Sequence, residues 1–122
     1  MKILYWNARG IANGDMRRAL KNLVSSHKPS IVCLSEPFIL ANSIPVSYWR
    51  SMRLSFVTTN DRGTHDPNLW LLCNDALMLS VISKSAQQIT FSYSIDGVHC
   101  VITTVYAKTS VVGRRHSFGR TL

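Results

Sequence analysis

Apolar and polar residues follow one another in the first 36 positions in the order expected of a strand, a loop, a helix and a second strand. Residues 2–6 are a mainly apolar run of strand length, which the sequence at 7–10 breaks. Residues 31–35 are a second apolar run, interrupted only by Ser35, as is typical of a strand with both faces covered. This order predicts a right-handed βαβ unit whose two strands are parallel.

The segment between these two strands has the periodicity of an amphipathic helix. Apolar residues recur three, four, seven and eight positions apart, and basic and polar residues occupy the other face. Asn13 or Asp15 can cap the start of this helix, and Pro29 follows soon after its end. The apolar positions are Met16, Ala19, Leu20, Leu23 and Val24.

Beyond residue 53 the pattern changes to the two-residue alternation of strands. Before that point, residues 38–53 indicate a connection with a short helix, and Pro45 suits the first turn of that helix. Asp96-Gly97 lies between two alternating runs and predicts a hairpin turn. Residues 109–122 have the pattern of a marginal helix that carries Arg114 and Arg115. The expected strands are 54–59, 69–73, 77–82, 89–95 and 98–106, with a polar loop at 60–67.

Composition and charge narrow the choice of partner. A chain of 122 residues is at most one domain, and its hydrophobic fraction of 46% is ordinary for a globular protein. The net charge of +8 suggests an anionic partner such as nucleic acid, and the alternative is a basic surface that is merely solvated. Cys33, Cys73 and Cys100 lie in apolar runs without metal-site spacing, so we expect reduced core thiols. No signal peptide or transmembrane segment is recognisable, and we therefore expect the nucleus or the cytoplasm.

Two polar side chains mark the ends of the first two strands. Asn7 follows the first apolar run, and Glu36 follows the second. In open α/β sheets, ligands bind at the carboxyl ends of the strands. Glu36 is also the only glutamate in the chain, so it is not one of many acidic surface residues. The alternatives are an asparagine that only turns the chain and a glutamate that only starts a loop before Pro37.

Four segments of the sequence form a recognisable set in order and spacing. They are Trp6-Asn7-Ala8-Arg9-Gly10, Ile31 to Glu36, Asn68 to Cys73, and Val105-Tyr106-Ala107 with Arg114-Arg115. Together they resemble the endonuclease/exonuclease/phosphatase family. More closely, they resemble the N-terminal half of the endonuclease domain of plant LINE-type (non-LTR) retrotransposon proteins.

The resemblance implies a fold of the α/β class. We expect half of a two-sheet α/β sandwich, with an N-terminal βαβ unit followed by mostly antiparallel strands. Residues 1–122 would then be a single partial domain whose C-terminal half is missing. On this basis we also expect the chain to build mainly one of the two sheets.

Members of this family hydrolyse phosphodiesters or phosphomonoesters with Mg²⁺ or Mn²⁺. By resemblance, Glu36 is the metal-binding carboxylate, and Asn7 lies beside the metal and the attacked phosphate. Mg²⁺ prefers oxygen ligands and keeps several waters, so one or two carboxylates and a substrate phosphate suffice. The resemblance also implies that Tyr106 contacts the phosphate, although a strand-end tyrosine is often only packed.

DNA is the substrate that the resemblance implies. Arg9, Arg114 and Arg115 are the candidate contacts to it, and the alternative is again a solvated basic surface. The family's later motifs are an Asp-x-Asn segment that activates the water and a Ser-Asp-His segment that supplies the general base. We expect both segments to be missing from this chain, and the only adjacent histidine and aspartate are His65-Asp66, in reverse order.

The sequence therefore predicts a truncated metal-dependent DNA endonuclease that is inactive alone. One alternative is a non-catalytic basic module that binds nucleic acid or a protein partner. Another is a remnant with no biochemical role.

Overall fold

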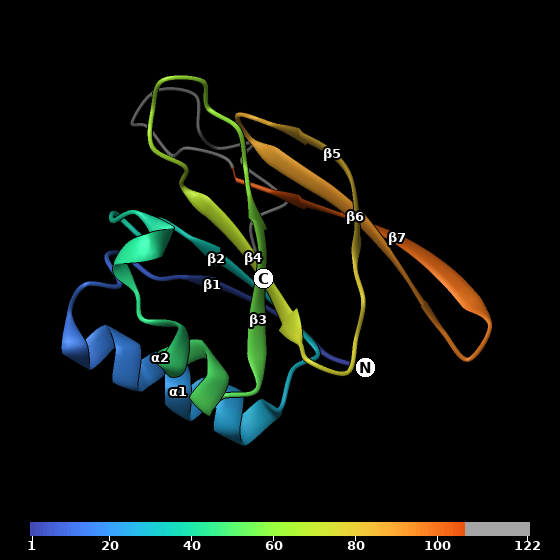
Figure 1. Ribbon diagram of the computed structural model, residues 1–122, viewed down its shortest axis with the longest axis horizontal. Coiled ribbons are helices and arrows are strands. Elements are labelled where there is room, and N and C mark those ends of the chain that lie inside the picture. The colour runs from blue at the N-terminus through green and yellow to red at the C-terminus, as the bar shows by residue number, and fades with distance from the viewer. Residues whose placement is uncertain (107–122) are drawn as a thin grey trace, which may run out of the picture.

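The computed structural model describes residues 1–106, which form two β-sheets and the helices that cover one of them (Figure 1). The first sheet has the strand order β1-β2-β4-β3, and the second has the order β5-β6-β7. The first sheet contains β1 (Ile3–Asn7), β2 (Ile31–Ser35), β3 (Leu54–Thr59) and β4 (Leu69–Asn74). The second contains β5 (Ser80–Ser85), β6 (Gln88–Ile95) and β7 (Val98–Val105). The helices are α1 (Gly14–His27), η1 (Ala41–Ser43) and α2 (Val46–Ser51).

The expected βαβ unit is confirmed. Strands β1 and β2 are parallel, and Asn7 is the register partner of Ser35. The side chain of Asn13 caps α1 by accepting a hydrogen bond from the backbone N–H of Asp15 at 2.7 Å. The helix ends at Lys28, which adopts the left-handed conformation with φ of 49°.

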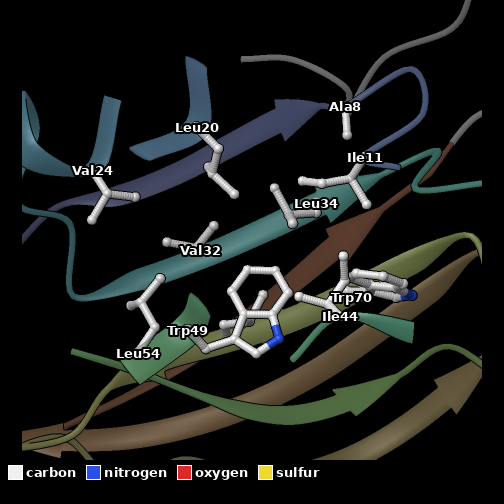
Figure 2. Close-up of a cluster of buried hydrophobic side chains, with 11 residues drawn as sticks. Ala8, Ile11, Leu20, Val24, Val32, Leu34, Ile44, Trp49, Leu54 and Trp70 are labelled. Atoms are coloured by element: carbon white, nitrogen blue, oxygen red, sulfur yellow. The ribbon is translucent and has the colours of Figure 1, made fainter. Parts of the chain in front are cut away.

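The first sheet lies between two hydrophobic cores. On one face, residues of α1 and α2 pack against alternate side chains of β2 and β4, as Figure 2 shows for Leu20 and Val24 above Val32 and Leu34. On the other face, the intervening side chains of β2 and β4 meet the second sheet. These side chains are Ile31, Cys33, Leu69, Leu71 and Cys73, opposite Ile89 and Phe91 of β6. Both faces of β2 are therefore covered, as its apolar run predicts.

Two expectations about the strands are wrong. The chain does not build mainly one sheet, because β4 joins the first sheet while β5, β6 and β7 form the second. The strand expected at 77–82 is β5 and runs three residues later, from 80 to 85. Leu77 and Leu79 pack against the core between the sheets before this strand begins, whereas all six residues of β5 are exposed. The apolar residues Leu77 and Leu79 therefore belong to the segment that precedes β5 and not to the strand.

The remaining strands begin and end within one residue of the expected positions, and the predicted hairpin is confirmed. Asp96 and Gly97 join β6 to β7, and both have positive φ angles, 52° and 78°. All three cysteines are free thiols, and Cys33 and Cys73 are buried. Within residues 1–106, no helix has the length and apolar character needed to cross a membrane. The helix expected at 109–122, with Arg114 and Arg115, lies outside the described residues.

Candidate metal and phosphate site

The loops that follow β1 and β2 run side by side at one end of the first sheet. Their backbones continue the pairing of the two parallel strands, and Ala8 and Ile11 anchor the first loop because both are fully buried. This arrangement holds the backbones of Asn7 and Glu36 next to each other. Three backbone hydrogen bonds join the two loops, from Ala8 N to Ser35 O at 2.8 Å, from Gly10 N to Glu36 O at 2.9 Å, and from Ile11 N to Pro37 O at 2.9 Å.

The backbone of these loops is strained. Arg9, Glu36 and Phe38 have φ angles of 46°, 54° and 60°, in the left-handed region that residues with side chains rarely adopt. Gly10, at φ of 95°, occupies a conformation that glycine alone adopts without cost. Strained residues persist only where the surrounding structure fixes them, and they cluster at functional sites. Here the left-handed conformation of Glu36 follows directly after Ser35, the last residue of β2.

The Glu36 side chain meets Tyr106, which follows β7 of the second sheet. The Tyr106 hydroxyl donates a hydrogen bond to Glu36 Oε2 at 2.7 Å. The backbone N–H of Tyr106 donates to Gln87 O at 2.8 Å, and Tyr5 donates its hydroxyl to the neighbouring Val105 O at 3.1 Å. Partial burial and the bond to Glu36 raise the pKa of Tyr106 to about 12, so its hydroxyl stays protonated at neutral pH.

The predicted convergence of Asn7, Glu36 and Tyr106 at one end of the fold is therefore seen. The Asn7 side chain accepts a hydrogen bond from the backbone N–H of Arg9 at 3.0 Å, which shapes the loop and leaves acceptor capacity on Oδ1. Arg9 is exposed beside this end of the sheet. Arg114 and Arg115, the other candidate DNA contacts, lie outside the described residues.

Sequence reasoning missed the contribution of the loop between β3 and β4. Asn68 O accepts the backbone N–H of Glu36 at 3.0 Å, so this loop supports the candidate carboxylate directly. Arg62 of the same loop is partly buried, and its charge lowers the pKa of Tyr106 slightly against the larger effects of burial and Glu36. Asn68 opens one of the four segments that carry the resemblance, but no role was assigned to it. Arg62 is a polar residue in a polar stretch and carries no periodic signal.

The same loop holds an Asp-x-Asn triplet, Asp66-Pro67-Asn68, although the later motifs of the family were expected to be missing altogether. This triplet precedes Tyr106 in the chain, whereas in the resembled family the motif comes later. Asp66 is exposed, and its backbone oxygen accepts a hydrogen bond from Arg62 at 2.7 Å. The Asn68 side-chain oxygen accepts from Asn60 at 2.7 Å. The hydrogen bonds of Asp66 and Asn68 therefore stabilise the β3–β4 loop itself.

The donor atoms at this end of the sheet suit a hard cation. Glu36 supplies one carboxylate, of which one oxygen is bonded to Tyr106, and Asn7 supplies an amide oxygen. No cluster of three or more histidine, cysteine, aspartate or glutamate residues able to hold a metal occurs among residues 1–106. Mg²⁺ fits such a sparse set, since it is bound through one or two carboxylates, several waters and substrate phosphates. A structural Zn²⁺ site, which needs four protein ligands, does not fit.

Solved structures share this fold at low sequence identity. The endonuclease domain of TRAS1, a telomere-specific non-LTR retrotransposon, superposes with a TM-score of 0.61 at 12% identity, covering 87% of this chain and 45% of that one. An AP endonuclease from Archaeoglobus fulgidus gives 0.54 at 15% identity, covering 83% and 39%. An endonuclease/exonuclease/phosphatase family protein from Leptotrichia buccalis gives 0.53 at 10% identity, covering 88% and 54%.

The fold is that of the endonuclease/exonuclease/phosphatase proteins. The chain spans between 39 and 54% of the length of these three structures. No family model and no curated protein matches the sequence. The predicted α/β class and half-sandwich architecture are confirmed.

Proposed function

We propose that this chain carries the metal- and phosphate-binding part of a metal-dependent DNA endonuclease of the LINE-type retrotransposon class. The observation that carries the proposal is the 2.7 Å bond between the Tyr106 hydroxyl and the Glu36 carboxylate, at the carboxyl end of a buried strand. The endonuclease domain of TRAS1 among the fold neighbours and the net charge of +8 support DNA as the substrate.

Each of the three residues has a role that its chemistry suits. Glu36 and Asn7 would hold Mg²⁺ or Mn²⁺ through their side-chain oxygens, and the bound ion would supply positive charge to a phosphate oxygen. Tyr106 donates its single hydroxyl hydrogen to Glu36, so it would donate to a phosphate oxygen only when that bond gives way, for example when Glu36 turns to a bound ion. Arg9 is exposed beside the site and is proposed to contact the DNA backbone, as are Arg114 and Arg115.

The chain is proposed to bind metal and DNA without cleaving the DNA. Two observations support this: residues 1–106 contain no cluster of three or more histidine, cysteine, aspartate or glutamate side chains able to hold a metal, and no Ser-Asp-His segment occurs in the sequence. General-base assistance alone is typically worth 10²- to 10⁴-fold in rate, or roughly 3–5 kcal/mol of barrier. We therefore expect no measurable nuclease turnover from the isolated chain.

Calorimetric titration with Mn²⁺ tests the metal site. We expect the wild-type chain to bind one Mn²⁺ and the Glu36→Gln variant to bind it at least tenfold more weakly, because the carboxylate proposed to hold the ion is lost. Asp66→Asn is the matched control, since it removes an exposed carboxylate from the neighbouring loop. Loss of Mn²⁺ binding in Asp66→Asn, with wild-type binding in Glu36→Gln, would contradict the proposal and assign the metal to the His65-Asp66 loop.

Two DNA assays separate the proposed function from its alternative. We expect no Mg²⁺-dependent nicking of a supercoiled plasmid, and robust nicking that disappears in Glu36→Gln would overturn the proposed inactivity. The high net charge favours a second candidate, a non-catalytic basic module that binds nucleic acid. Salt-sensitive DNA binding that neither Mn²⁺ nor Glu36→Gln alters would select this second function.

A further inference from the structure

Asn60 is a buried polar side chain outside the proposed metal and phosphate contacts. It follows β3, and only 2% of its surface is exposed. Its Nδ2 donates to Asn68 Oδ1 at 2.7 Å and to Ala86 O at 2.9 Å. Its Oδ1 accepts the backbone N–H groups of Asn68 and Leu69, both at 3.0 Å. Burying an amide is costly unless it is hydrogen-bonded, and all four bonds are made here. They join the end of the β3–β4 loop, at residues 68–69, to the turn between β5 and β6, at Ala86.

The two segments that Asn60 joins are the backbone supports of Glu36 and Tyr106. On the side of the first sheet, Asn68 O accepts the N–H of Glu36 at 3.0 Å. On the side of the second sheet, Ala86 lies in the turn between β5 and β6, next to Gln87, whose carbonyl oxygen accepts the N–H of Tyr106 at 2.8 Å. One side chain therefore connects the supports of two residues that come from different sheets.

A second contact reinforces this junction. The backbone N–H of Asp61 donates to Ser85 O at 3.2 Å. The three successive carbonyl groups at 85–87 thus accept hydrogen bonds from Asp61, from the Asn60 side chain and from Tyr106. The turn has little freedom to shift relative to the β3–β4 loop while these bonds persist.

We propose that Asn60 is a positioning residue that sets the placement of Glu36 relative to Tyr106 by clamping the β3–β4 loop to the β5–β6 turn. Its importance for metal binding rests on the proposed function, whereas the clamp itself does not. Residues that orient metal ligands commonly change metal affinity 10- to 100-fold when they are replaced.

Amide hydrogen exchange, measured residue by residue by NMR on the full chain without metal, tests the clamp. We expect Asn60→Ala to accelerate exchange of the Glu36 and Tyr106 amides at least tenfold more than exchange of amides in the middle of β2. Asn60→Asp keeps the acceptor for the Asn68 and Leu69 amides but loses both donors. We therefore expect Asn60→Asp to accelerate exchange of Tyr106 more than that of Glu36, and this variant also serves if Asn60→Ala does not fold.

Asn74→Ala is the matched control, because Asn74 lies at the opposite end of β4 and also supports a turn. Its Oδ1 accepts the N–H of Ala76 at 2.9 Å. We expect this variant to lower stability without selective acceleration at Glu36 or Tyr106. A pattern in the Asn60 variants that matches the Asn74→Ala pattern would overturn the clamp.

Mn²⁺ titration links the clamp to the site. We expect at least tenfold weaker binding in Asn60→Ala and wild-type binding in Asn74→Ala. Equal Mn²⁺ affinity in the wild type and in a folded Asn60→Ala or Asn60→Asp variant would overturn the positioning role. If Glu36→Gln leaves Mn²⁺ binding intact, the proposed function fails, and the exchange pattern still decides whether Asn60 is the clamp.

Discussion

The two sheets of this chain differ in how they are covered, and the candidate site is built from both. All five residues of β2 in the first sheet are buried, because helices cover one face and the second sheet covers the other. All six residues of β5 in the second sheet are exposed, and β7 alternates between covered and exposed positions. The first sheet provides Glu36 and the second provides Tyr106.

This difference indicates where the site is most easily disturbed. Glu36 follows a strand that is fixed on both faces, whereas Tyr106 follows an edge strand of a sheet with one open face. The placement of Tyr106 relative to Glu36 therefore depends on how firmly the second sheet is held against the first. The packing of β6 on β2 and β4 and the junction around Asn60 are the two structures that hold it.

Removing the main inter-sheet contact has the largest expected effect. Phe91 is fully buried between the sheets, so Phe91→Ala should lower the free energy of unfolding by about 3–5 kcal/mol. Leu20→Ala, on the helix side of the first sheet, should lower the free energy of unfolding by a comparable amount, about 2–5 kcal/mol. Urea unfolding measures both costs. NMR of the residual folded state should show that Phe91→Ala perturbs the Tyr106 signals and that Leu20→Ala does not. Equal perturbation of the Tyr106 signals by the two variants would show that the placement of Tyr106 does not depend specifically on the packing between the two sheets.

A smaller effect is expected from the loop that holds Asn7 beside Glu36. Gly10 has φ of 95°, so Gly10→Ala should cost about 1–3 kcal/mol of stability through backbone strain. The space itself is adequate, because an added Cβ would meet Phe38 Cδ2 at an ordinary 3.6 Å. Gly14→Ala is the matched control, since Gly14 has open space around its Cα and lies in α1. A stability change in Gly10→Ala no larger than in Gly14→Ala would show that this loop is not strained.

The smallest expected effect is a dependence of stability on alkaline pH. The pKa of Tyr106 is raised from 10.0 to about 12 by burial and the bond to Glu36. Its contribution is therefore fully present below pH 10 and is lost as pH rises toward 12, because the unfolded chain releases the proton first. Cys33 and Tyr48 also have raised pKa values, so the wild type must be compared with Tyr106→Phe. We expect a shallower loss of stability in Tyr106→Phe, and equal slopes would contradict the raised pKa.

The strands of the first sheet could be predicted from sequence because each has a clear pattern of apolar residues, which is continuous in the buried strands β2 and β4. An apolar run marked residues 31–35, and a two-residue alternation marked residues 54–59, both at the bounds that the structure shows. Parallel pairing of the first two strands placed Asn7 beside Glu36. The bounds of β5 could not be predicted, because that strand is exposed and the nearby apolar residues Leu77 and Leu79 pack before it begins. Asn60 could not be found either, since its burial arises from contacts with Ala86, which is distant in sequence, and not from any local pattern.

The central claim is that Glu36 and Tyr106 form one unit across the two sheets. A double-mutant cycle with Glu36→Gln, Tyr106→Phe and the combined variant, measured by urea unfolding at pH 7, tests this most directly. We expect the two changes to be non-additive by at least about 0.5 kcal/mol, as for residues joined by a hydrogen bond to a charged group. Additivity within about 0.3 kcal/mol would contradict the account, since it would mean that the two side chains do not interact in the folded protein.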